Sequence, residues 1–186
     1  MRAWIGIFLV VGLGLAGCAP TTVVTVDGTP TTGRAKIYRI GGNDTAKIQF
    51  RMLDSVNALR AAAGLPALDL DGSLNAAAVT HSNDMSLQNR PWHFGSDGSS
   101  PIDRVSRAGY PGNLKGELIS ETYETELETL AAWMEQPDTR RVVMDPEAVH
   151  MGLGWKQEKN GKIWWTMVTG GDGAAVIPAP NPIPNI

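Results

Sequence analysis

The chain has 186 residues, of which 42% are hydrophobic and 19% are charged, and its formal net charge is −3. This length suits one ordinary domain with residues to spare. A mildly acidic chain without clustered Lys and Arg is a poor candidate for nucleic-acid binding, so no nucleic-acid partner is expected. A single cysteine excludes a disulfide framework within the chain and any zinc site built from several cysteines.

The first 18 residues have the pattern of an export signal. Arg2 precedes a nearly unbroken apolar stretch from Trp4 to Leu15. Twelve helical residues span roughly 18 Å, less than the ~30 Å hydrocarbon core of a bilayer, so residues 1–17 are predicted to be a signal peptide. The sequence Leu15-Ala16-Gly17-Cys18 resembles the lipobox of bacterial lipoprotein precursors, which implies cleavage before Cys18 and its lipidation. The alternative is an ordinary secretory peptide with an incidental cysteine.

A lipid on Cys18 would decide where the protein works. Two or three acyl chains, such as palmitate, hold a protein almost permanently on a bilayer. The pattern therefore predicts a lipoprotein of the cell envelope whose folded part is extracytoplasmic and whose first partner is the membrane. By the sorting pattern of such lipoproteins, Ala19 in place of aspartate implies the outer membrane, facing the periplasm, in a Gram-negative organism.

One folded domain, residues 45–173, is predicted between two segments that cannot bury a core. Residues 18–44 are rich in Thr, Pro and Gly and are expected to be a flexible spacer, and residues 174–186 a Pro-rich tail. Apolar residues at helical spacing predict three helices in the domain. These run from Thr45 to Ala63, from Asp71 or Ser73 to Met85, and from Glu124 to Glu135, and Ile102 to Ala108 is predicted to form one or two helical turns.

The last third of the domain changes to the period of strands. Residues 150–155 and 162–168 are predicted to pair as a hairpin, because Asn160-Gly161 between them is typical of a tight turn. Residues 36–40 alternate weakly and are a further candidate for a short edge strand. Helices followed by an antiparallel hairpin predict an α+β domain.

A series of short motifs runs through this domain in a fixed order. In the order of the chain they are Leu59–Leu68, Leu74–Met85, His93, Ser96-Asp97-Gly98, Arg104–Tyr110, Gly116-Glu117-Leu118-Ile119, Trp133-Met134, Arg140, Pro146, Gly152-Leu153-Gly154 and Trp165-Thr166. Together they resemble the CAP superfamily (cysteine-rich secretory proteins, antigen 5 and pathogenesis-related 1 proteins), in particular its cysteine-poor bacterial branch. The resemblance covers about residues 54–170. It implies an α–β–α sandwich with a central antiparallel sheet, a groove beside the sheet, and a further strand near residues 116–120.

The resemblance also implies a candidate site. In many family members two histidines and two glutamates converge in the groove and can hold a divalent cation. Carried over by position, His93 takes the first histidine place and Glu117 the first glutamate place. The other places fall on or beside Glu135, Gln136, Trp164 and, by comparison with some bacterial relatives, Thr139. Because a zinc site needs at least three protein ligands, a zinc cofactor is an alternative that requires a third ligand, and no complete metal site is expected.

The remaining histidines have different surroundings. His81 shares a predicted helix face with Leu74 and Met85, and is expected to be a hydrogen-bonded core histidine. His150 begins a strand and is expected at the end of the sheet, so it would reach the groove only if the fold bends it inward. For His93 and Glu117, a buried hydrogen-bonded pair and a functional role in the groove are equal alternatives.

Two further patterns bear on function. A Ser/His/Glu arrangement can be drawn from Ser96 or Ser99 with His93 and Glu117, although the chain has neither Gly-x-Ser-x-Gly nor His-Glu-x-x-His. Adjacent Trp164 and Trp165 must point to opposite faces of their strand. Either both belong to the core, or one of them, with Trp164 at the groove position, lines an apolar groove suited to a lipid or another small apolar ligand.

These features predict a lipid-anchored, extracytoplasmic CAP domain that is not an enzyme and binds a ligand or partner in the cell envelope. Its groove would be lined by His93, Glu117 and Trp164. The first alternative is a divergent envelope hydrolase that uses His93 and Glu117 on a peptide or cell-wall substrate. The second is a structural envelope protein whose groove is vestigial.

Overall fold

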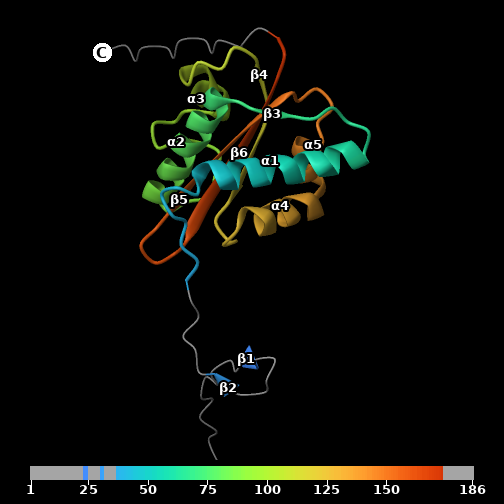
Figure 1. Ribbon diagram of the computed structural model, residues 1–186. Helices are drawn as coiled ribbons and strands as arrows, with labels where there is room; N and C mark the ends of the chain where they lie inside the picture. Colours follow the sequence, from blue (N-terminus) through green and yellow to red (C-terminus); the bar gives the residue numbers. More distant parts are fainter. Residues whose placement is uncertain (1–22, 25–29, 32–36, 174–186) are drawn as a thin grey trace, which may run out of the picture. The chain divides into compact units, whose positions relative to one another are not determined.

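The computed structural model describes residues 23–24, 30–31 and 37–173 (Figure 1). The predicted signal peptide, Cys18 and the Pro-rich tail lie outside the described residues. The chain divides into two units, residues 1–36 and 37–186. In the first unit the described residues form one antiparallel pair, β1 (Val23–Val24) with β2 (Pro30–Thr31).

The second unit contains the folded domain, an α+β arrangement as predicted. Its helices are α1 (Thr45–Ala62), α2 (Gly72–Gln88), α3 (Pro101–Arg107), α4 (Glu126–Glu135) and α5 (Pro137–Val143). Its strands are β3 (Asp69–Leu70), β4 (Asn113–Ser120), β5 (His150–Gln157) and β6 (Ile163–Gly171). Within the described ranges, no helix has the length and hydropathy that crossing a bilayer requires.

The four strands form one sheet in the order β3-β5-β6-β4 (Figure 1). β4, β5 and β6 are antiparallel neighbours, as predicted, and only the two-residue β3 runs parallel to β5. The strand expected near residues 116–120 is β4, which pairs with β6 so that Glu117 lies opposite Val168. This register decides which helices Glu117 meets.

Helices cover both faces of the sheet, which confirms the predicted sandwich. On one face Trp165 and Met167 of β6 belong to a core cluster with Met52 of α1 and Leu130 of α4. On the other face Val168 belongs to a second cluster, which includes residues of α2 and α3. The alternation along β6 follows from the two-residue period of a strand. Glu117, opposite Val168, therefore faces the layer of α2 and α3.

α2 lies unusually close to β5, and two glycines allow this approach. A Cβ atom at Gly152 would come within 3.0 Å of the backbone of Leu74 and Asn75, and one at Gly154 would do the same at Ala78 and Val79. Real Cβ atoms do not approach backbone so closely, so these positions of the sheet accept only glycine. The close contact brings Ser82 of α2 to β6, where its hydroxyl donates to Thr166 at 2.8 Å, and it buries His81 on the same face of the helix.

Two segments differ from the sequence-based expectation. Residues 37–40 do not form the candidate edge strand; instead Arg39 donates to the carbonyl of Glu158 at 3.0 Å and the Ile40 amide donates to Gln157 Oε1 at 3.0 Å. These residues pack against the end of the β5–β6 hairpin. Helix α5 was not expected, because its seven residues are too few to show a helical period.

Candidate functional site

A buried carboxylate is the centre of the candidate site. The Glu117 side chain on β4 is 3% exposed, and the Arg104 side chain on α3 is 4% exposed. Arg104 Nη2 lies 2.8 Å from Glu117 Oε1 and 2.7 Å from Oε2. His93 Nδ1 is 2.9 Å from Oε1 of the same carboxylate, and His81 Nε2 is 3.5 Å from it. One carboxylate thus gathers a guanidinium and two imidazoles.

Local structure explains how Arg104 reaches this position. Ser100 and Asp103 form a reciprocal capping box at the start of α3, with Pro101 in its first turn, so the helix begins at a defined residue. Arg104 follows one turn later. Besides Glu117, its guanidinium donates to the carbonyls of Ser99 at 3.1 Å and His93 at 2.9 Å. The side chain therefore ties the loop after α2 to strand β4.

The loop between α2 and α3 is held at its other end by Asp84 of α2. Asn89 adopts a left-handed conformation that ends α2. Asp84 then accepts hydrogen bonds from the amide and the hydroxyl of Ser96, both at 2.6 Å. In the sequence His93 lies between Asn89 and Ser96, and its ring remains half-exposed.

His81 is completely buried on α2 and is kept neutral. Its Nε2 lies 2.9 Å from the carbonyl of Trp92 and must be the protonated nitrogen, since a carbonyl only accepts. Its Nδ1 has no partner among the described residues. Burial lowers the pKa of His81, and the positive charge of Arg104 acts in the same direction against the attraction of Glu117.

Glu117 is kept ionised despite its burial. Burial alone would raise its pKa, but the hydrogen bond from His93 and the charge and hydrogen bonds of Arg104 outweigh this and hold the pKa below the ordinary value of 4.5. A general base works best when its pKa is near the operating pH. Glu117 is therefore a poor proton acceptor and a good anchor for a cation.

The buried histidine predicts a pH-dependent stability. Below pH 6.5, the ordinary pKa of histidine, the unfolded chain binds a proton at His81 that the folded chain does not bind. The free energy of unfolding should therefore fall with pH from 6.5 downward, by up to about 1.4 kcal/mol per pH unit. Urea unfolding between pH 7.5 and 4.5 measures this.

The matched variant is His81→Gln, which keeps a donor for the Trp92 carbonyl and removes the titration. It should flatten the curve between pH 6.5 and 4.5. Both proteins should lose stability at lower pH, because Glu117 contributes stability above its ordinary pKa of 4.5 that is lost as the pH falls through its depressed value. Equal slopes above pH 4.5 in both proteins would contradict the assignment of neutral His81.

The donor set does not suit a divalent cation. Among residues 37–173, no group of three or more His, Cys, Asp or Glu side chains is arranged to hold a metal ion. Both oxygens of Glu117 already accept from Arg104, whose guanidinium supplies the positive charge at this place. The site is therefore an ion pair with two histidines beside it.

The structure does not bring the other predicted ligand positions to Glu117. Trp164 is fully buried, and its Nε1 donates to Glu158 Oε1 at 2.6 Å while the Lys162 ammonium lies 3.7 Å from its ring centre. Thr139 Oγ1 donates to the carbonyl of Trp133 in the layer of α4 and α5, on the other face of the sheet. Glu135 and Gln136 lie at the end of α4 in that same layer.

The serines and His150 are also apart from the ion pair. Ser96 Oγ donates to Asp84, and Ser99 contributes its backbone carbonyl to Arg104, so neither hydroxyl is hydrogen-bonded to His93. His150 Nδ1 is 3.0 Å from the hydroxyl of Tyr110, and the two rings meet edge to face. The Ser/His/Glu arrangement is not assembled.

Sequence reasoning missed Arg104 as a member of the site and treated His81 as a core residue only. Arg104 stands in one of the family-like motifs, and a buried strand glutamate requires a cationic partner. This requirement could have predicted that some cation pairs with Glu117. The sequence could not show which arginine it is, since that depends on how α3 lies against β4.

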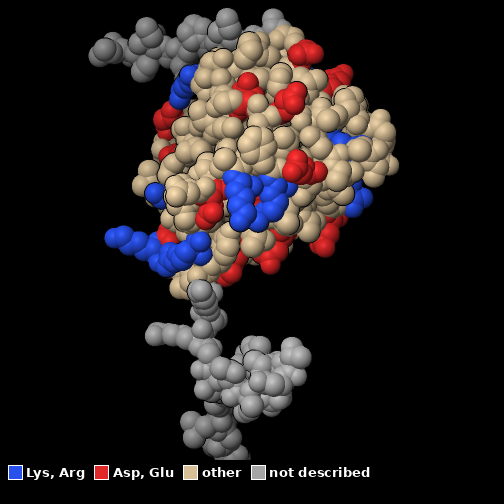
Figure 2. Space-filling model, viewed as in Figure 1, with Lys and Arg blue, Asp and Glu red and all other residues tan. Residues whose placement is uncertain are grey.

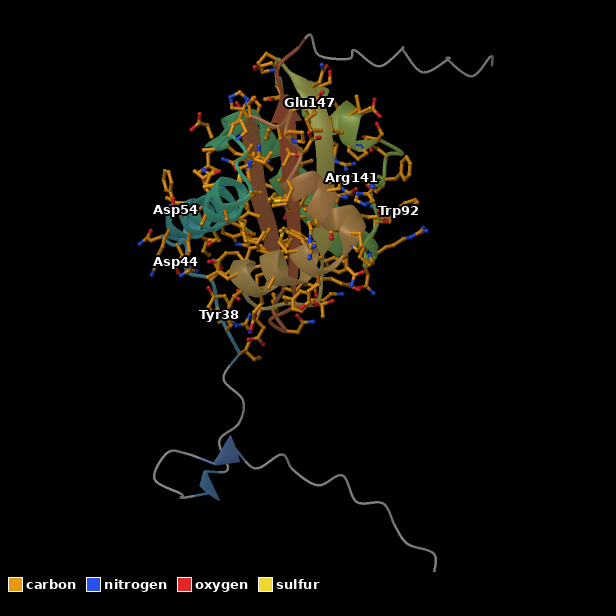
Figure 3. The ribbon with its side chains drawn as sticks, turned by 90° about the vertical axis from the view of Figure 1, so that its right-hand side faces the viewer. Tyr38, Asp44, Asp54, Trp92, Arg141 and Glu147 are labelled. Carbon is orange, nitrogen blue, oxygen red and sulfur yellow. The ribbon has the colours of Figure 1, made fainter. Side chains whose placement is uncertain are left out.

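Beside the ion pair lies a cleft between α2 and α3 with a volume of about 640 Å³. Small residues line it, among them Ala76 of α2 and Ala108 at the end of α3, together with the loop that carries Ser96 and Asp97. Arg104 belongs to this lining as well as to the ion pair. The cleft lies on the sheet face opposite α1, because α2 and α3 pack on that face. Asp54 of α1 and Trp92, in the loop after α2, lie on opposite sides of the domain (Figure 3).

A protein-family model matches most of the folded domain. The model of the cysteine-rich secretory protein family (CAP) matches residues 53–169. An uncharacterized protein, YkwD of Bacillus subtilis, is 30% identical over 114 residues, which are 61% of this chain and 44% of that protein. An uncharacterized membrane protein, YlbC of the same organism, is 26% identical over 104 residues, 56% of this chain and 30% of that protein. The chain thus spans less than half the length of either relative.

Solved structures agree on the fold. An outer surface protein from Borrelia burgdorferi superposes with a TM-score of 0.64 at 16% identity, covering 74% of this chain and all of that one. An extracellular protein containing an SCP domain from Bacillus anthracis gives a TM-score of 0.60 at 20% identity, covering 72% and 45%. At these identities the similarity concerns the fold alone.

Proposed function

Because the chain belongs to the cysteine-rich secretory protein family, we propose that it is a lipid-anchored, extracytoplasmic CAP domain that binds a ligand or partner in the cell envelope. The observation that carries this proposal is the state of Glu117. Its carboxylate is buried, ionised and held by Arg104 and His93, so it serves neither as a metal ligand nor as a general base. The arrangement holds the loop beside a preformed cleft, which suits binding.

The envelope location is supported by two independent features. The lipobox-like sequence ending in Cys18 implies an anchor, and two of the structural relatives are described as an outer surface protein and an extracellular protein. Cys18→Ser should abolish the incorporation of labelled palmitate into the full chain, since the site of the acyl chains would be lost. Equal incorporation by the variant and the unchanged chain would contradict the anchor.

Binding of nucleic acid finds no support. Figure 2 shows Lys and Arg interspersed with Asp and Glu on the face that α1 covers, without a basic stripe. The whole chain is also acidic, with a net charge of −3. Ligands of the envelope are the better candidates.

A hydrolase remains the second candidate because of one observation. Glu117 holds Nδ1 of a half-exposed His93, and a carboxylate orients a catalytic histidine in the same way. Among the described residues, no serine or other nucleophile is hydrogen-bonded to His93. The nucleophile of a hydrolase would therefore have to be a water molecule or a group of the substrate.

One experiment separates binding from hydrolysis. The full chain and His93→Ala should show equal, background-level cleavage of envelope peptides and esters, and a chelator or added zinc should leave the thermal midpoint of both unchanged. Cleavage that disappears in His93→Ala would establish the hydrolase. A zinc-dependent rise in the midpoint that disappears in His93→Ala would establish a metal site, because a ligand that binds the folded state stabilises it.

A further inference from the structure

The cleft between α2 and α3 has the chemistry of a site for a neutral polar ligand. Its volume of about 640 Å³ is within the usual range of small-molecule sites. Two acidic and two basic side chains line it. Asp97 forms an ion pair with Arg107 at 2.6 Å, Arg104 is neutralised by Glu117, and Asp84 accepts hydrogen bonds from Ser96 but has no cationic partner among the described residues. The carboxylates around the cleft therefore exceed the guanidinium groups by one, and an anionic ligand is disfavoured.

The walls of the cleft offer hydrogen bonds, and its floor is apolar. Asn83, Asp84 and Ser96 supply amide, carboxylate and hydroxyl groups, whereas Ala76 and Ala77 supply small apolar surface between them. Asn83 donates to the carbonyl of Val79, and Ser96 donates to Asp84, but a long acyl chain in the cleft would still take the Asp84 carboxylate out of water, which is unfavourable. A ligand with hydroxyl groups at its edge and apolar faces satisfies both kinds of surface.

An exposed apolar rim lies at one end of the cleft. Leu87, which lines the cleft, is 85% exposed, and Phe94 is 48% exposed. The ring centre of Phe94 lies 5.6 Å from that of Trp92, which sits at the surface of the domain (Figure 3). Gln88 Nε2 joins the rim to the wall, because it donates both to the Phe94 carbonyl at 3.3 Å and to Asp84 at 3.0 Å. Aromatic rings next to polar groups are a suitable platform for a ring with apolar faces.

A buried donor completes the site. Arg104 Nε has no hydrogen-bond partner within the part of the chain that the structure describes, although its side chain is only 4% exposed and lines the cleft. Buried N–H groups are nearly always paired in folded proteins. An acceptor on a bound ligand, such as a hydroxyl or acetamido oxygen, would supply the missing partner.

We infer that the α2–α3 cleft binds a short neutral glycan, with acetamido sugars as the chemical class that matches its donors, its apolar floor and its aromatic rim. This inference rests on the proposed ligand-binding function and names both its site and its ligand class. The cleft is separate from the His93–Glu117 pair, but Arg104 both lines the cleft and binds Glu117. The glycan chains of a cell envelope would be accessible to a domain held there by a lipid.

The test is calorimetric titration of the full chain with tetra-N-acetylchitotetraose, in a detergent without a sugar headgroup. Saturable binding is expected. Phe94→Ala should weaken it by about fivefold to tenfold, because an aromatic contact is lost. Ala76→Trp should abolish it by filling the cleft. Phe50→Ala is the matched control, since Phe50 is also exposed, at 58%, but lies on α1; it should bind like the unchanged protein.

Three results would overturn the inference. These are the absence of saturable binding by a chain with an unchanged thermal midpoint, equal affinities of Phe94→Ala and Phe50→Ala, and full binding by Ala76→Trp.

Titration with the neutral peptide trialanine distinguishes the two proposals. If only the peptide binds, and Ala76→Trp blocks it, the glycan is wrong and the ligand-binding function stands. Cleavage of the glycan that depends on His93 would instead refute the non-enzymatic function while leaving the cleft as a glycan site.

Discussion

Gly154→Ala should destabilise the domain by about 3 kcal/mol or more, and at 37 °C the variant is expected to be largely unfolded. A Cβ atom at this position meets the backbone of Ala78 and Val79 in α2, not the tip of a flexible side chain. Relief of the clash requires α2 to move away from β5, which separates the second core cluster from the sheet. Overpacking of a core costs 1–3 kcal/mol where side chains can adjust, and more where backbone must move. Urea unfolding, or yield of soluble protein if none folds, measures the effect.

Gly72→Ala is the control for this substitution. Gly72 is the first residue of α2, and a Cβ atom there meets no atom within 4 Å. The same chemical change should therefore be neutral or slightly stabilising, because alanine restricts the unfolded chain more than glycine does. Similar stabilities of the Gly154→Ala and Gly72→Ala variants would show that α2 does not lie against β5 as described.

The second large effect is expected at Arg104. Arg104→Met removes the guanidinium and leaves the carboxylate of Glu117 buried without its main counter-ion. Removing one partner of a buried ion pair costs about 3–5 kcal/mol. The screening that weakens surface pairs does not apply here, since both side chains are nearly inaccessible to water. The pKa of Glu117 should rise in this variant, so that the loss of stability below pH 4.5 should be smaller than in the unchanged protein.

A double-mutant cycle tests whether this cost belongs to the pair. Glu117→Gln alone should also destabilise, because it leaves a buried cation facing a neutral amide. The double variant Arg104→Met, Glu117→Gln should cost clearly less than the sum of the two single changes, with a coupling of about 1–3 kcal/mol. Strict additivity would mean that Arg104 and Glu117 do not interact as the structure describes.

The structure separates the ion pair from the other positions at which the family resemblance implied metal ligands. Trp164 is in the core, and Thr139 lies on the far face of the sheet. The Arg104 guanidinium on α3 neutralises Glu117 and ties the loop that carries His93 to β4.

Local patterns in the sequence were sufficient for much of the fold. The helical spacing of Ile48, Met52 and Val56 predicted α1, and Asn160-Gly161 predicted the β5–β6 hairpin, because each pattern reports on contacts within a few residues. The ordered motifs identified the family. They also selected His93 and Glu117, which the structure places 2.9 Å apart. The signal peptide and the lipidation of Cys18 are predictions from the same kind of local pattern.

The surroundings of that pair could not be predicted from local patterns. Whether Glu117 meets Arg104 and His81, and whether Trp164 reaches the groove, depends on the register of β4 against β6 and on how closely α2 approaches β5. A periodic pattern states which face of an element is buried, but not which residue of another element lies against it. The partner of a buried charge is therefore a non-local property. In this protein the partner of Glu117 is Arg104, so the residues predicted as possible metal ligands include one member of an ion pair beside a cleft.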